Sequence, residues 1–115
     1  MKEFEGKIQY KNKTYRLPFS INVLEKLQEK YGSYDKWLEL LMPKNGEEIN
    51  ISALKFGFAA MLNEGIAADN DENGTDVALL TLDQVGRIIT DVGLQSTMDS
   101  ITDATNKGTK EEKNE

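Results

Sequence analysis

The sequence predicts an α+β fold in which an N-terminal β-hairpin packs on a mainly helical domain of four to five helices. The apolar residues have a period of two over residues 4–19 and a helical period from residue 20 onward, and the helical segments are separated by capping residues and glycines. The chain has 115 residues, of which 38% are hydrophobic and 30% charged, so it can form one core. We therefore expect a single α+β domain over residues 1–104.

The hairpin is predicted from two alternating segments. Residues 4–10 and residues 14–19 each place aromatic or aliphatic side chains on one face and polar or charged side chains on the other. The polar residues between them form a short loop, in which Asn12 tolerates a positive φ. Pro18 has no amide donor, so we expect strand pairing to end near it.

Helices are predicted over residues 21–31 and 34–42, over 51–64, and from Thr81 to Gly93. Ser20 or Asn22 can cap the first helix, Ser33 can cap the second, and Thr81 with Gln84 forms a capping box for the fourth. The segment 51–64 is apolar on most sides, which is typical of a central core helix.

The C-terminal segment 105–115 contains no apolar residue. A segment that cannot bury apolar surface does not compensate the entropy of ordering, so we expect a disordered polar tail.

Composition and charge exclude several classes of function. The chain has no Cys and no His, which removes thiolate nucleophiles, imidazole bases and the usual zinc ligands, and it has 14 basic and 20 acidic residues, a net charge of −6. A basic face for nucleic acid is hard to assemble from these residues, and no segment is apolar enough to span a membrane.

The carboxylate pairs, such as Glu47 with Glu48, lie in solvated segments, and no glycine motif for nucleotide binding is present. We expect a soluble cytoplasmic protein that is not an enzyme and needs no cofactor.

An acidic segment, Asp69-Asn70-Asp71-Glu72-Asn73-Gly74, fits the first six positions of an EF-hand calcium loop. Asp69, Asp71 and Asn73 are the candidate metal ligands. The twelfth position, where the motif needs a bidentate carboxylate, is Leu80, so the segment also fits a hydrophilic turn-forming loop. A small calcium-binding or calcium-stabilised domain is the alternative function that this segment suggests.

Leu94, Met98 and Ile101 are candidates for binding a partner. They lie at helical spacing on an otherwise polar stretch next to the predicted tail, which suits a segment that orders against another protein. A last helix that packs on its own domain explains the same spacing, and the sequence leaves both readings open.

The order of these features resembles a known family. A hairpin and helix in KNKTYRLPFSINVLEKLQEKYGS, an apolar helix in LKFGFAAMLNEG and then LTLDQVGRII are similar to the tail assembly chaperones of long-tailed bacteriophages and of prophages in Gram-positive bacteria. The resemblance covers about residues 7–93.

The resemblance implies a non-enzymatic role in virion morphogenesis in the host bacterial cytoplasm. Proteins of this family bind the tape measure protein, keep it soluble and recruit tail tube subunits, and self-association is possible. In many relatives a translational frameshift near the end of the reading frame adds a second domain, and the polar tail is where such a junction would fall.

Overall fold

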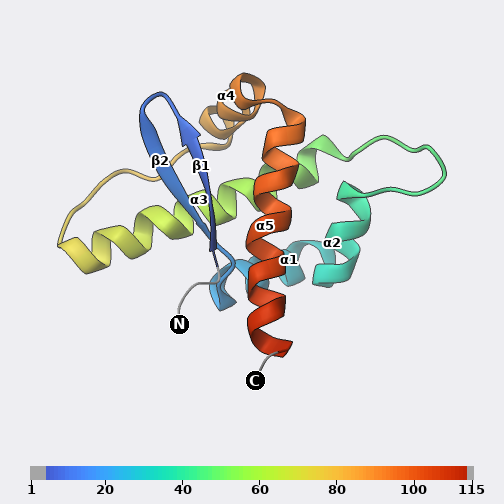
Figure 1. The fold of residues 1–115 in the computed structure, drawn as a ribbon, viewed down its shortest axis with the longest axis horizontal. Coiled ribbons are helices and arrows are strands. Elements are labelled where there is room, and N and C mark those ends of the chain that lie inside the picture. Colours follow the sequence, from blue (N-terminus) through green and yellow to red (C-terminus); the bar gives the residue numbers. More distant parts are fainter. Residues whose placement is uncertain (1–4, 114–115) are drawn as a thin grey trace.

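The computed structural model describes residues 5–113, with side chains from residue 6 to residue 106. The predicted α+β class is confirmed, with an N-terminal hairpin packed against five helices (Figure 1). In chain order the elements are β1 (Glu5–Tyr10), β2 (Lys13–Pro18), α1 (Ile21–Tyr31), α2 (Tyr34–Leu41), α3 (Ile51–Asn73), α4 (Leu82–Val92) and α5 (Leu94–Lys113).

The two strands form an antiparallel hairpin. Tyr10 pairs with Lys13, so the loop is only Lys11 and Asn12, which have φ values of 50° and 63°. Two consecutive residues with positive φ match the right-handed twist of a hairpin. The pairing ends at Pro18, as the sequence predicts.

The helix ends follow the predicted caps. The hydroxyls of Ser20 and Ser33 accept hydrogen bonds from the backbone N–H three residues later, and Thr81 and Gln84 form the complete capping box. Gly32, with a φ of 95°, ends α1. These local hydrogen bonds satisfy N–H groups that a helix start leaves free.

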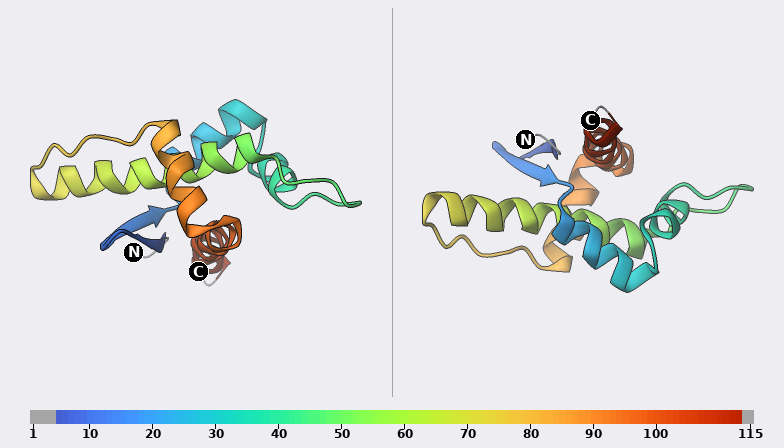
Figure 2. Two further views of the ribbon diagram at one scale, coloured as in Figure 1. Left: turned by 90° about the horizontal axis from the view of Figure 1, so that it is seen from above. Right: turned by 90° about the horizontal axis from the view of Figure 1, so that it is seen from below.

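The hairpin lies between α3 and α5, because β2 packs on α3 and β1 packs on α5 (Figure 2). Glycines permit both close approaches. A Cβ on Gly65 of α3 would lie 2.7 Å from the carbonyl oxygen of Arg16, and a Cβ on Gly6 of β1 would lie 3.0 Å from that of Ser100.

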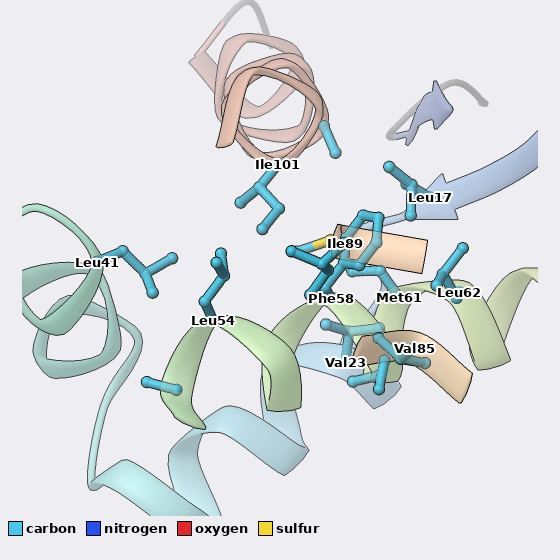
Figure 3. Close-up of a cluster of buried hydrophobic side chains, with 14 of the residues drawn as sticks. Leu17, Val23, Leu41, Leu54, Phe58, Met61, Leu62, Val85, Ile89 and Ile101 are labelled. Atoms are coloured by element: carbon cyan, nitrogen blue, oxygen red, sulfur yellow. The ribbon is translucent and has the colours of Figure 1, made fainter. Parts of the chain in front are cut away.

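The core is centred on α3, whose middle is buried on all sides. Figure 3 shows Leu17 and Ile101 on one side of α3 and Val23 and Val85 on the other. Trp37 of α2 is fully buried, and its indole Nε1 donates a hydrogen bond of 3.0 Å to the carbonyl oxygen of Ala53. The prediction that residues 51–64 form the central core helix is therefore confirmed.

Two helices extend well past the ends that the sequence predicts, whereas the other predicted boundaries lie within about one residue of the structure. Helix α3 continues past residue 64 to Asn73, and Gly65 lies inside it in close contact with β2. Helix α5 continues to Lys113, although a disordered tail was expected over 105–115; residues 114–115 lie outside the described part. Ala104 and Thr105 are buried, so the helix is anchored at the start of the expected tail, and the Lys and Glu residues that follow are good helix formers that extend an existing helix.

Candidate protein-binding groove

An open groove of about 430 Å³ lies where the start of α3 meets α4 and the α4–α5 junction. We call it the α3–α4 groove, and its lining residues are Ile51, Lys55, Gly86, Ile89, Thr90, Gly93 and Leu94. Ile51 is 52% exposed and Leu94 is 45% exposed, whereas Ile89 is buried at the base. Apolar side chains that line a concave surface can receive the apolar side chains of another molecule.

Local structure places the two exposed side chains. The Asn50 side chain caps α3 by accepting a hydrogen bond of 2.9 Å from the N–H of Ala53, which puts Ile51 on the first, solvent-facing turn. Gly93 has a φ of 96° and separates α4 from α5, so Leu94 follows directly on the turn. Only a residue that readily adopts positive φ suits this position.

Two residues of the groove lining are glycines with open space beside them. A Cβ placed on Gly93 would meet no atom within 4 Å, and one on Gly86 would meet only the flexible side chain of Lys55, at 3.4 Å. The hydroxyl of Thr90 donates to the carbonyl oxygen of Gly86 at 2.9 Å and is therefore satisfied. Lys55 is the one charged residue in the lining, and in the described part of the chain no carboxylate forms an ion pair with it.

The three residues expected to bind a partner have different environments. Leu94 is exposed in the groove, Met98 is half-buried against the core, and Ile101 is 1% exposed and lies inside the core. The packing of Met98 and Ile101 matches the alternative in which the last helix packs on its own domain. Of the three, Leu94 is accessible on the surface.

The acidic segment 69–74 is not a loop, so that prediction is wrong. Asp69, Asp71 and Asn73 lie in the last turns of α3, and Gly74 ends the helix in the left-handed conformation. Alternate residues of a helix point about 200° apart, so Asp71 points away from the other two candidates. Asp69 instead forms an ion pair with Arg16, at 2.5 Å. No group of three or more acidic residues that could hold a metal ion occurs among the described residues.

A second pocket, of about 270 Å³, lies between β2 and the C-terminal half of α3. Tyr15, Leu62 and Ile66 form its apolar wall, and the Arg16–Asp69 ion pair lies at its edge. The two charged side chains are 30% and 49% exposed, so water screens them and the pair contributes little to stability.

Between residues 6 and 106, two tyrosines have a pKa that departs from its ordinary value. Burial raises the pKa of Tyr31 above 10.0. Burial also raises the pKa of Tyr34, the nearby Asp35 carboxylate adds to this, and a hydrogen bond with Thr105 acts in the opposite direction. Both tyrosines therefore stay protonated at neutral pH.

Sequence patterns missed much of the groove. Ile89 belongs to a predicted apolar stripe, and Gly86 lies inside a predicted helix, where glycine costs about 1 kcal/mol relative to alanine. An isolated glycine inside a helical pattern is therefore the local signal that points to this position. Which side of α4 stays open depends on how α3 and α5 pack against it.

The part of the chain that the structure describes contains no helix that is both long and apolar enough to cross a membrane. Comparisons with protein-family models, with curated proteins and with solved structures find no match to this chain.

Proposed function

We propose that this protein is a tail assembly chaperone of a long-tailed phage or prophage. It acts without catalysis in the bacterial cytoplasm, binds the tape measure protein and recruits tail tube subunits. The family is proposed from the resemblance of residues 7–93, and the α3–α4 groove is the observation that carries the binding role.

The groove suits an apolar segment of a partner. Ile51 and Leu94 are about half exposed and line the same opening as two glycines and the buried Ile89, so a partner's apolar side chain has access to an apolar surface. Amphipathic helices commonly bind in such grooves through apolar residues spaced three or four positions apart. A long helical tape measure protein offers this pattern repeatedly.

The charge of the chain suits a protein that keeps an apolar partner in solution. Its net charge is −6, and like charges on neighbouring complexes repel one another. Groove contacts thus cover apolar surface of the partner while the acidic exterior prevents aggregation.

The test is co-expression with the long tape-measure-like protein encoded in the same gene neighbourhood, followed by a solubility assay and pull-down. We expect the partner to become soluble and to co-purify. A partner that stays insoluble and unbound would refute the proposal.

Substitutions in the groove locate the interface. Burying the exposed half of Ile51 or Leu94 contributes about 1 kcal/mol each, so the double variant Ile51→Ser/Leu94→Ser should weaken binding about 30-fold. The matched control is Ile21→Ser, which removes an apolar side chain that is 77% exposed on α1. Equal binding by both variants would show that the groove is not the interface. Ile101→Ser is unsuitable, because this side chain belongs to the core.

A further inference from the structure

The segment between α3 and α4 is an extended strap, which we define as residues 75–81, that runs back along α3 (Figures 1 and 2). Two asparagines of α3 hold it. The Asn70 side chain bonds to both the N–H and the carbonyl oxygen of Val77, each at 3.0 Å. The Asn63 side chain does the same for Leu80, at 2.8 and 3.0 Å.

The two asparagines bond only to backbone groups of the strap, and several apolar side chains there are exposed to solvent. Leu80 is half-buried against the core, but Val77, Leu79 and Leu82 are 49%, 54% and 50% exposed. Seven large apolar side chains are exposed in the described part of the chain, and these are three of them. Single exposed apolar residues are common, whereas a group of them on one fixed segment is typical of an interaction surface.

The strap and the residues next to it in the chain carry charges of one sign. Residues 69–83 contain five acidic residues and no basic residue. Asp76 lies within the strap, Asp83 follows it, and both are exposed. Lys13 and Arg16 of β2 line the same pocket as Val77 of the strap, and Arg16 pairs with Asp69 and approaches Glu72 to 3.9 Å.

We propose that the strap, together with Leu82 and Asp83, docks a basic amphipathic segment of a partner protein, in which Lys or Arg residues alternate with apolar residues. The apolar side chains cover Val77, Leu79 and Leu82, and the cations lie beside Asp76 and Asp83. Charge complementarity selects this occupant, because nucleic acids, anionic lipid surfaces and acidic peptides are repelled by the same carboxylates.

The strap differs in chemistry from the α3–α4 groove. The groove lining contains Lys55 and no carboxylate, whereas the strap contains Asp76, is followed by Asp83, and has no basic residue of its own. The two surfaces therefore suit different segments, and the proposal for the strap stands whether or not the tape measure protein binds in the groove.

The test uses two synthetic amphipathic peptides with the same leucines, one with lysine at every polar position and one with glutamate. Binding to the full chain is measured by fluorescence anisotropy at about 50 mM and about 300 mM salt, because screening weakens exposed charge contacts. We expect the lysine peptide to bind, at least tenfold more weakly at the higher salt, and the glutamate peptide not to bind.

Variants assign this binding to the strap. Val77→Ser/Leu79→Ser should weaken binding of the lysine peptide at least tenfold, and Asp76→Asn/Asp83→Asn at least threefold. The controls are Ile21→Ser, for loss of an exposed apolar group, and Glu25→Gln/Glu29→Gln, for loss of two exposed charges on α1. Thermal unfolding confirms that each variant is folded.

Three results would overturn the proposal: no binding of the lysine peptide, equal binding of both peptides, or equal losses in the strap and control variants. The last result would mean that the peptide responds only to the net charge. None of these assays uses the tape measure protein, so their failure is distinct from failure of the proposed function.

Discussion

Replacing Gly57 by alanine is the sharpest test of how α2 packs on α3. Gly57 is buried in the middle of α3, directly against the indole ring of Trp37. A Cβ at this position would lie 2.7 Å from Cε2 and 2.9 Å from Nε1 of the ring, and closer still to Cζ2. The indole therefore has to move, although it is fully buried and hydrogen-bonded to Ala53.

Three effects determine how much the substitution changes the free energy of unfolding. Alanine is favoured over glycine in a helix interior by about 1 kcal/mol. Overpacking a core costs about 1–3 kcal/mol, and the overlap here falls at the upper end because the neighbour is a rigid ring. Loss of the indole hydrogen bond costs about 1 kcal/mol more. We expect a net destabilisation of about 2–3 kcal/mol, which lowers Tm by about 10 °C for a domain of this size.

The matched control is Gly86→Ala. This glycine also lies in a helix, but its Cβ would meet only the flexible side chain of Lys55, at 3.4 Å. Alanine at this position should stabilise the protein by about 0.5–1 kcal/mol. Urea unfolding, followed by circular dichroism and Trp37 fluorescence, measures both variants. If Gly57→Ala proved as stable as Gly86→Ala, the packing of Trp37 against α3 would be refuted.

Three further results are expected. Asn63→Ala should cost about 1–2 kcal/mol and speed hydrogen exchange at the Leu80 amide, because both strap hydrogen bonds of Asn63 are lost; unchanged exchange would contradict its fastening role. Stability should fall as the pH rises above 10 through the raised pKa values of Tyr31 and Tyr34, because folding favours their protonated forms. Urea unfolding at pH 9 and 11 should show a smaller fall for Tyr34→Phe than for the unchanged protein. An identical fall in both would argue against this cause. Millimolar calcium should shift Tm by less than about 1 °C, because the candidate ligands diverge on α3; a rise of several degrees would restore the calcium alternative.

The sequence predicted the hairpin and the helix starts because their signals are local. A side chain that caps a helix bonds to a backbone group three residues away, as Ser20, Ser33 and Thr81 do. Strand alternation likewise repeats within a few residues. Such patterns involve only residues that are close in the chain, so they can be recognised from the sequence alone.

The sequence-based predictions were wrong at two places, where a glycine and a group of acidic residues each fit more than one local structure. Gly65 resembles a helix stop, but β2 passes so close that a side chain would collide with Arg16. The acidic run after it resembles a calcium loop, but the helix continues through it, and Asp69 pairs with Arg16 from a distant strand. Both outcomes depend on a contact between segments about fifty residues apart in the chain.

The residues of the α3–α4 groove could be predicted only in part from the sequence. Leu94, Met98 and Ile101 share a spacing that fits a partner-binding stripe as well as a core-facing one. Tertiary packing separates them, because α5 packs on β1, placing Ile101 in the core and leaving Leu94 exposed beside Ile51. Spacing records which residues share a helix face, but not what covers that face.

The sequence by itself therefore determined the fold class, the caps, the absence of histidine and cysteine chemistry, and the acidic charge. Only the tertiary structure showed that α3 extends to Asn73 and that Asn63 and Asn70 hold the strap by hydrogen bonds. It also showed which apolar residues of α5 lie in the core and which lies in the groove. The physical reason is that composition and capping act over a few residues, whereas burial is a property of surfaces that the chain brings together from distant positions.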